Sequence, residues 1–385
     1  MCSSDLNRHY LDHASSSPPR PEVISAMTDW LEQAGAGDPS RIHEDGRQAR
    51  AAIEEAREKV AALLGTRARQ VIFTSSGTEA ANAAIWGASR AHPGASIACA
   101  AVEHSCVIRP AARMAPVVEL SVDKSGRIQA EDVEELLAGH RGGKRPVALV
   151  NCQWANHEIG TVQPVETIVS RCRDAGVLTH IDASAAAGHV PLDLEGIGAD
   201  LVSVSAHKLG GPLGAGALVV RRGLRLEPLL MGGTQERARR AGIENLPAIV
   251  GFGAAAETLT GGSLQREATT ARQFTETLLT QALSVPGTSA LGDPRARVPH
   301  IVCLGIEDVL GEAALIALDH LGISVHSGSA CSSESFEPSP VIQAIGADPN
   351  RSLRVSVGWS STAEDIDAFS SAFPQVLAEL RALRT

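Results

Sequence analysis

Lys208 is the residue of this sequence with the clearest chemical potential. It lies in residues 202–212, where an apolar, β-branched run leads into Ser-Ala-His-Lys-Leu and is followed by Gly-Gly-Pro. This pattern predicts a buried strand that ends in a flexible turn, with a primary amine at the strand end. A lysine removed from water has a lowered pKa, and its neutral amine can form a Schiff base. The alternative for an isolated Lys-Gly junction is a solvated turn.

A candidate anion site precedes Lys208 in the chain. Residues 70–74 are typical of a strand and run directly into Ser-Ser-Gly-Thr-Glu-Ala, which opens a helix. Backbone N–H groups and the helix dipole both face such a turn, so Gly77 and Thr78 could bind an anion. The alternative is an ordinary Ser-x-x-Glu capping box. A Walker-type Gly-Lys-Ser/Thr and the dinucleotide glycine pattern are both missing, which favours a single phosphate.

One cysteine stands apart from the other six. The chain has seven cysteines, all scattered singly and without a Cys-x-x-Cys pair, so we expect neither a disulfide framework nor a metal site. Most of them have apolar neighbours, but Cys331 lies among small polar residues on a predicted loop, residues 327–338. Packing does not require a thiol there, and a reactive cysteine is therefore favoured.

The elements that must position these residues alternate between strand and helix from residue 70 to residue 220. Near-continuous apolar strands that alternate with helices predict an α/β fold, with a mostly parallel sheet and helices on both faces. Ligands bind such sheets beyond the carboxyl ends of the strands. The residues expected at those ends are Thr78, His104, Asn156, His157, Asp182, Ser205, His207 and Lys208.

The segments before residue 70 and after residue 220 indicate a second domain, and a length of 385 residues also suggests two domains. Helical patterns are expected over residues 21–33 and 48–64, and helical character continues from residue 246 to about residue 283. The C-terminal part is expected to form a smaller α+β domain. Its predicted strands are residues 301–304, 324–326 and 352–357, and its predicted helices are residues 312–320, 340–345 and 362–383.

Composition excludes several classes of protein. The net charge of −10 argues against nucleic acid as a partner, because phosphate binding favours a basic surface. The N-terminus lacks the apolar core of a signal peptide, and no window approaches a membrane-spanning apolar run. We therefore expect a cytoplasmic protein that does not act at a membrane.

Taken together, these segments resemble the cysteine desulfurases, a group of class V aminotransferases in the fold-type I family of pyridoxal phosphate enzymes. The resemblance implies a seven-stranded-type sheet in a large cofactor-binding domain, residues 16–260. Residues 1–15 and 261–385 would form the small domain that carries the cysteine loop. Around Cys331 the chain resembles the long-loop subgroup and lacks the Arg-x-Gly-His-His-Cys type of sequence of the short-loop subgroup. The matching segments are Tyr-Leu-Asp-His-Ala from Tyr10, Gly-Thr-Glu from Gly77, Val-Glu-His from Val102, Glu-Ile-Gly-Thr from Glu158, Ser-Ala-His-Lys from Ser205, Gly-Ser-Ala-Cys from Gly328 and Arg-Val-Ser from Arg354.

The resemblance implies roles for these residues around pyridoxal 5′-phosphate. Lys208 would bind the cofactor as a Schiff base and later move the α-proton of the substrate. Asp182 would pair with the pyridinium nitrogen, so that the ring can absorb electrons. His104 would stack on the ring and assist proton transfer, and Arg354 would clamp the substrate carboxylate with Asn156 nearby. The phosphate would be held by Gly77, Thr78, Ser205 and His207.

The implied reaction removes sulfur from L-cysteine. The Cys331 thiolate would attack the substrate sulfur, release L-alanine and retain a persulfide, which the loop would pass to a sulfur-acceptor protein. That acceptor would be a scaffold or carrier of iron–sulfur cluster or thio-cofactor biosynthesis. Residues 232–245 resemble a loop that completes the partner's site in this family, so a homodimer is expected.

Four departures from the family pattern fall on the cofactor. His157 stands where a second asparagine neighbours the ring oxygen, and Ala185 stands where a glutamine bonds the same oxygen. Ile243 replaces a threonine that touches the partner's phosphate, and Ser15 to Ser17 replace Ala-Thr-Thr. We expect retained desulfurase chemistry with altered ring electronics, in which His157 compensates for Ala185. The alternatives are another pyridoxal phosphate carbon–sulfur lyase or aminotransferase that forms no persulfide, and a non-catalytic assembly subunit.

Overall fold

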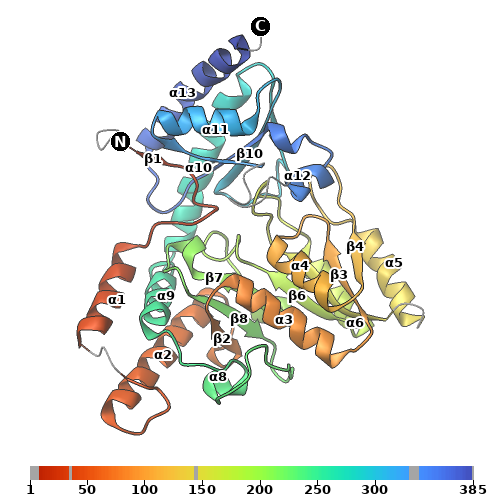
Figure 1. Ribbon diagram of the computed structural model, residues 1–385, viewed down its shortest axis with the longest axis vertical. Coiled ribbons are helices and arrows are strands. Elements are labelled where there is room, and N and C mark those ends of the chain that lie inside the picture. Colours follow the sequence, from red (N-terminus) through yellow and green to blue (C-terminus); the bar gives the residue numbers. More distant parts are fainter. Residues whose placement is uncertain (1–7, 34–36, 143–145, 329–337, 384–385) are drawn as a thin grey trace.

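The computed structural model describes residues 8–33, 37–142, 146–328 and 338–383 (Figure 1). A seven-stranded sheet forms its centre, with strand order β2-β8-β7-β6-β5-β3-β4. β8 runs antiparallel to both of its neighbours, while the other pairings are parallel. The predicted mostly parallel sheet is therefore confirmed. Its strands are β2 (Val71–Thr74), β3 (Ser96–Ala100), β4 (Val117–Leu120), β5 (Val147–Gln153), β6 (Leu178–Asp182), β7 (Leu201–Ser205) and β8 (Gly216–Val220).

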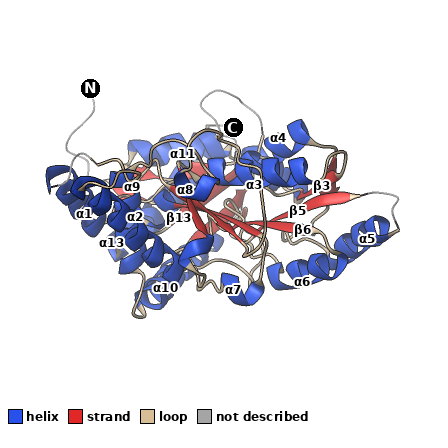
Figure 2. Cartoon of the chain, turned by 90° about the horizontal axis from the view of Figure 1, so that it is seen from below, coloured by secondary structure: helices blue, strands red, loops and turns tan. Residues whose placement is uncertain are grey.

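Helices cover both faces of this sheet (Figure 2). Every residue of β5, β7 and β8 is buried, and strands that are apolar on both sides require a helical layer on each face. One layer holds α3 (Gly77–Ala91) and α4 (Ser105–Met114). The opposite layer holds α5 (Ala130–Arg141), α6 (Val165–Ala175) and the short α7 (Leu194–Ile197).

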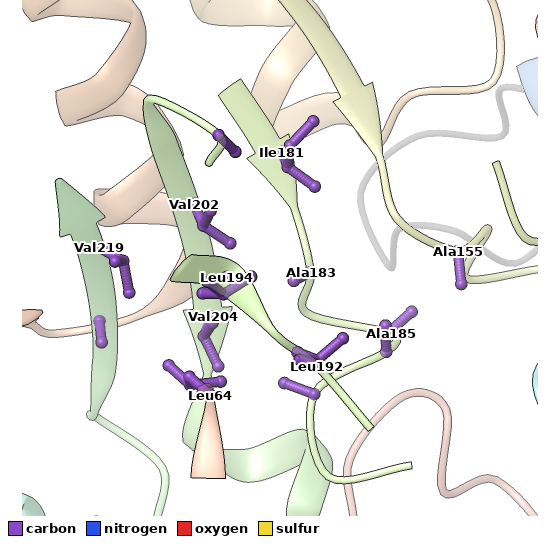
Figure 3. Packing of buried hydrophobic residues seen from close by; sticks show 14 of the residues in the cluster. Leu64, Ala155, Ile181, Ala183, Ala185, Leu192, Leu194, Val202, Val204 and Val219 are labelled. Atoms are coloured by element: carbon purple, nitrogen blue, oxygen red, sulfur yellow. The ribbon is translucent and has the colours of Figure 1, made fainter. Parts of the chain in front are cut away.

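Apolar packing continues from the sheet to the predicted site. Val202 and Val204 of β7 lie beside Leu64 and Leu194, and the same buried cluster contains Ala185 (Figure 3). The small side chains of Ala183, Ala185, Ala186 and Ala187 after β6 are buried in this core. The core thus fixes the ends of β6 and β7, which carry the predicted functional side chains.

A third group of helices packs beside the sheet: α1 (Pro21–Gln33), α2 (Glu44–Leu63) and α9 (Leu246–Thr258). α9 and α2 approach closely at Gly253, where a Cβ atom would lie 2.7 Å from the Cα of Ala56. The predicted continuous helical character from residue 246 to residue 283 is interrupted. α9 ends at Thr258, and α10 (Ser263–Leu283) begins after a turn in which Gly261 and Gly262 have positive φ.

The C-terminal part forms a smaller α+β unit, as predicted. Its antiparallel sheet has the order β12-β13-β10-β9, and β1 pairs in parallel with β11 from the other end of the chain. The strand expected at residues 324–326 is divided between β11 and β12, and β9 was not predicted because it is short and half polar. The predicted domain boundary after residue 260 falls in the turn between α9 and α10 and stays a prediction. The elements are β1 (His9–Tyr10), β9 (Thr288–Leu291), β10 (Ile301–Ile306), β11 (Ile323–Ser324), β12 (His326–Ser327), β13 (Ser352–Ser356), α11 (Gly311–His320), α12 (Pro340–Ala344) and α13 (Ala363–Ala382).

Over the described residues, none of the helices combines the length and the apolar character needed to cross a membrane.

A buried ion pair holds a strained segment of the chain. In α8 (Gln235–Ala238), Glu236, Arg237 and Ala238 all have positive φ, between 46° and 60°. Left-handed backbone costs roughly 1–2 kcal/mol for each non-glycine residue. The Glu236 carboxylate accepts hydrogen bonds from Arg57 at 2.6 and 2.7 Å and from the backbone N–H of Phe73 at 2.8 Å. These buried bonds keep the segment in its strained conformation.

Replacing Arg57 by methionine should lower the free energy of unfolding by about 3–5 kcal/mol, because the Glu236 carboxylate would stay buried without its counter-charge. Denaturant unfolding measures this loss. The control is Arg67→Met, which breaks an exposed ion pair with Glu195 and should cost no more than about 1 kcal/mol. Equal losses in the two variants would contradict the account of this ion pair.

Candidate functional site

A cavity of about 360 Å³ lies at the carboxyl ends of β5, β6 and β7. Its size is within the range of small-molecule sites. Residues from the small sheet close it on the other side, so both domains contribute to its wall. The predicted site residues that line it are Gly77, Thr78, His104, His157, Asp182, Ala185, Ser205, His207, Lys208 and Arg354.

Lys208 enters this cavity from a short 3₁₀ turn, η2 (Ala206–Leu209), directly after β7. Its ammonium group donates a hydrogen bond to the backbone oxygen of Ala14. Burial, together with the positive charge of Arg354, lowers the pKa of Lys208 to about 8, although Asp182 and Asp12 act in the opposite direction. A substantial fraction of Lys208 is therefore a neutral, nucleophilic amine near physiological pH.

Asp182 ends β6 and has a fixed orientation. Its Oδ1 atom accepts hydrogen bonds from the Ser203 hydroxyl and from the backbone N–H of Ser184, both at 3.0 Å. The Ser203 hydroxyl also lies 3.1 Å from Nε2 of His180, which is buried beneath the sheet end. The carboxylate is thus held by the two adjacent strands, β6 and β7, and still lines the cavity.

His104 is both a cavity residue and the N-cap of α4. Its Nδ1 atom accepts the backbone N–H of Cys106 at 3.1 Å, so a neutral His104 carries its proton on Nε2. Burial of the ring and the neighbouring His157 lower the pKa of His104 to about 4. The His104 and His157 rings meet edge to face, with centroids 4.9 Å apart. His104 is therefore a neutral imidazole with a defined donor nitrogen.

The candidate anion site in this cavity is formed by two turns, one at the N-terminus of α3 and one directly after β7. The N-terminus of α3 begins at Gly77, whose N–H donates to the Ser205 hydroxyl at 3.1 Å. A Cβ atom at Gly77 would lie only 2.3 Å from that hydroxyl oxygen, so a side chain there would close this cradle. Burial, together with the charge of Lys208, lowers the pKa of His207 to about 4, which leaves it a neutral neighbour. The α3 dipole and these donors favour an anion such as phosphate.

Arg354 of β13 also lines the cavity. Its Nη1 donates to the backbone oxygen of His157 at 2.8 Å, and its Nη2 donates to Asp12 at 2.7 Å and to Ser15 at 2.6 Å. Its buried Nε–H has no hydrogen-bond partner within the described part of the chain. Buried guanidinium donors are usually satisfied, so the unused N–H is consistent with a group that awaits a carboxylate.

The Asn156 side chain forms hydrogen bonds within the turn that contains His157 and Glu158. Its amide oxygen accepts the N–H groups of Glu158 and Ile159, both at 2.8 Å, and its amide nitrogen donates to Val102 at 3.1 Å. The side chain is fully buried and is not part of the cavity wall. Its donors and acceptors shape the turn that carries His157, and the predicted substrate contact of Asn156 stays a prediction.

Several cavity residues were not singled out from the sequence. Burial and the neighbouring Asp182 raise the pKa of Glu103 to about 8, and its Oε2 has no partner among the described residues. His326 pairs directly with Arg354 across β12 and β13 and also lines the cavity. The position of Glu103 next to His104 was an available signal, whereas the contact of His326 with Arg354 depends on tertiary structure. Cys331, the predicted nucleophile, lies outside the described residues.

The donor set fits pyridoxal phosphate. An anion cradle with no room for a side chain at Gly77, a fixed carboxylate at Asp182 and a depressed-pKa amine at Lys208 meet in one cavity. These groups are complementary to a phosphate, a pyridinium nitrogen and an aldehyde, respectively. Arg354, whose buried Nε–H has no partner among the described residues, lines the same cavity and is complementary to an amino-acid carboxylate.

The lowered pKa of Lys208 can be measured in cofactor-free protein. Amine labelling followed by mass spectrometry should reach half of its maximum near pH 8 at Lys208, because only the neutral amine reacts. Arg354→Met should shift this midpoint upward by removing a nearby positive charge. Lys59 is an internal control, since the carboxylates of Glu55 and Glu257 outweigh its partial burial and raise its pKa. A Lys208 midpoint at 10 or above would contradict the prediction.

Comparisons with known proteins agree over almost the whole chain. The family model for aminotransferase class-V matches residues 9–369. Cysteine desulfurase IscS of Methanosarcina thermophila is 36% identical, with 98% of this chain and 94% of that protein covered. A cysteine desulfurase of Trichormus azollae is 39% identical, with 97% and 94% covered.

Solved structures give the same result. The structure of a NifS-like protein from Rickettsia africae has a TM-score of 0.88 and 28% sequence identity, and the match covers 97% of this chain and 100% of that one. A second NifS-like protein has the same TM-score at 27% identity. The chain therefore belongs to the class-V aminotransferase family of pyridoxal phosphate enzymes, and within it to the cysteine desulfurases.

Proposed function

We propose that this chain removes the sulfur atom from L-cysteine, releases L-alanine and passes the sulfur to an acceptor protein through a persulfide on Cys331. One observation carries the assignment of the site: Lys208, with its pKa near 8, shares a cavity with a fixed Asp182 and with Arg354. The cysteine desulfurases among the relatives support the substrate and the reaction. The acceptor would be a scaffold or carrier protein.

Pyridoxal phosphate, when bound, supplies the electron sink that lets bonds at the α- and β-carbons of the substrate break. In this proposal Lys208 holds the cofactor covalently and then takes the substrate α-proton as a neutral amine. Asp182 keeps a proton on the ring nitrogen, and its two hydrogen bonds hold its carboxylate in place for this task. His104 stays neutral and offers Nε2–H as a donor at the cavity wall.

Arg354 would bind the substrate carboxylate through Nε–H. Asp12 and Ser15 already hold its Nη2, so the guanidinium plane is fixed before substrate arrives. This preorganisation lowers the cost of binding in the reactive orientation. His157 would supply the polar contact to the ring oxygen that Ala185 cannot make, since both residues line the cavity.

The sulfur-transfer step is assigned to Cys331 on the basis of the family motif. Its thiolate would attack the substrate sulfur, so that a new S–S bond forms while the bond between the β-carbon and sulfur breaks. The β-carbon keeps the electron pair of the broken bond and is protonated to become the methyl group of alanine. The persulfide then holds the sulfur until an acceptor thiolate attacks it.

The central test compares Cys331→Ser with the wild-type protein supplied with pyridoxal phosphate and L-cysteine. Alanine release should fall at least about 100-fold while the yellow absorbance of the bound cofactor is retained, because only the nucleophile is lost. Lys208→Ala should lose the covalent cofactor absorbance as well. Undiminished turnover in Cys331→Ser would favour a lyase or aminotransferase that forms no persulfide. A wild-type protein that gains no yellow absorbance would favour a non-catalytic assembly subunit.

We also propose a homodimer. Residues 232–245 resemble a loop that completes the partner's site, and large apolar side chains are exposed on and beside it, with Met231 64% and Ile243 67% accessible. Large apolar side chains that are exposed in this way are found at protein interfaces. Leu213 and Leu230 are exposed as well.

Light scattering after size-exclusion chromatography should give the mass of a dimer, about twice 40.1 kDa. Ile243→Asp should shift the population toward monomer, since a charge would be buried in an apolar interface. The exposed Leu321 of the small domain provides the control variant Leu321→Asp, which should remain dimeric. A fully active wild-type monomer would overturn this proposal.

A further inference from the structure

The turn that carries Lys208 is held by hydrogen bonds to several consecutive backbone oxygens. The oxygen of His207 accepts the N–H of Ser17 at 2.8 Å, and the oxygen of Gly210 accepts the N–H of Arg20 at 2.9 Å. The oxygen of Leu209 accepts Nε–H of Arg20 at 3.0 Å. An N-terminal segment almost 190 residues away in sequence therefore braces η2 along its length.

Arg20 is itself fixed from the opposite side. Its Nη1 and Nη2 donate to the two carboxylate oxygens of Glu267 on α10, both at 2.7 Å, in a bidentate pair. The Arg20 side chain is buried, and its guanidinium lies 5.6 Å from the ring centroid of Trp359. The guanidinium of Arg20 thus links α10 to the backbone of the turn that carries Lys208. A lysine in place of Arg20 could not make both contacts in the same way.

His189 completes the support at Lys208. Its Nε2 lies 3.0 Å from the backbone oxygen of Lys208, and because a carbonyl only accepts, Nε2 carries the proton. The ring stacks on buried His300 with centroids 3.5 Å apart and an interplanar angle of 14°. Burial lowers the pKa of His189 to about 3, so a neutral donor faces the turn. Every carbonyl from His207 to Gly210 consequently has an external donor.

We propose that Arg20, oriented by Glu267, is a positioning residue for Lys208: it fixes the backbone of residues 207–210 and thereby the place of the reactive amine. The proposal rests on the proposed role of Lys208. A lysine side chain is long and flexible. Its amine stays in one desolvated position only if the backbone is fixed and the side chain is closely packed by its neighbours. Arg20 acts through geometry, since the charges that shift the Lys208 pKa are those of Arg354, Asp182 and Asp12.

The test uses Arg20→Met, Arg20→Lys and Glu267→Gln in the full-length protein loaded with pyridoxal phosphate. Arg20→Met removes the donor to Leu209 and should lower kcat about 10-fold, with KM for L-cysteine changed less than about twofold, because the amine is misplaced while Arg354 is intact. Arg20→Lys should recover part of the loss. Glu267→Gln keeps both contacts of Arg20 to the turn and should lower kcat by a smaller factor.

A second readout separates positioning from general stability. In cofactor-free Arg20→Met, the labelling midpoint of Lys208 should rise above that of the wild type, because a loosened turn admits water to the amine. The control Arg67→Met removes an exposed ion pair and should leave both kcat and the Lys208 midpoint unchanged. If Arg20→Met does not fold, Glu267→Gln carries the same two measurements.

The outcomes distinguish this inference from the proposed function. Unchanged kcat and an unchanged Lys208 midpoint in folded Arg20→Met and Glu267→Gln, alongside an inactive Lys208→Ala, would overturn the positioning role alone. An active Lys208→Ala that still binds the cofactor covalently would overturn the assigned role of Lys208, and the positioning role with it. A fall in melting temperature without a change in kcat or midpoint would show that Arg20 is merely structural.

Discussion

The removal of the Lys208 amine from water is the constraint on which the rest of this structure depends. Burial favours the neutral amine, and the positive charge of Arg354 adds to that effect, while Asp182 and Asp12 oppose it. The balance lowers the pKa to about 8 without abolishing the charge. An amine poised in this way can exchange protons and form a Schiff base near neutral pH.

Both domains are needed to create that environment. The ends of β6 and β7 supply Asp182 and the lysine turn, and β13 of the smaller sheet supplies Arg354. The segment around Asp12 passes between them and bonds Arg354. Because these groups come from three parts of the chain, the site exists only when the two domains are packed together.

Much of the site followed from the sequence, because most of the functional residues end or follow an apolar strand or open a helix. Asp182, Lys208 and Gly77 could be placed at one edge of the sheet from strand patterns alone, and the family motifs added Arg354. The hydrogen bonds of Asn156 could not be predicted, because the direction of its side chain depends on the turn at Glu158 and Ile159. The order of residues does not reveal such local hydrogen bonding.

Other features depend on contacts between distant residues. The bonds of Arg354 to Asp12 and of Arg20 to Glu267 join residues more than 200 positions apart, and neither leaves a local pattern. Likewise, the end of α9 before Gly261 was hidden because apolar residues continue on both sides of the turn. Tertiary packing determines these long-range bonds and this helix end, and a single sequence gives little information about tertiary packing.

The most direct measurement is borohydride reduction of the protein loaded with pyridoxal phosphate, followed by peptide mapping. The chain has four lysines, Lys59, Lys124, Lys144 and Lys208, so the attachment site is resolved unambiguously. The account predicts a phosphopyridoxyl group on Lys208 alone, at about one per chain. A modification at another lysine, or none on a protein that still produces alanine from L-cysteine, would contradict it.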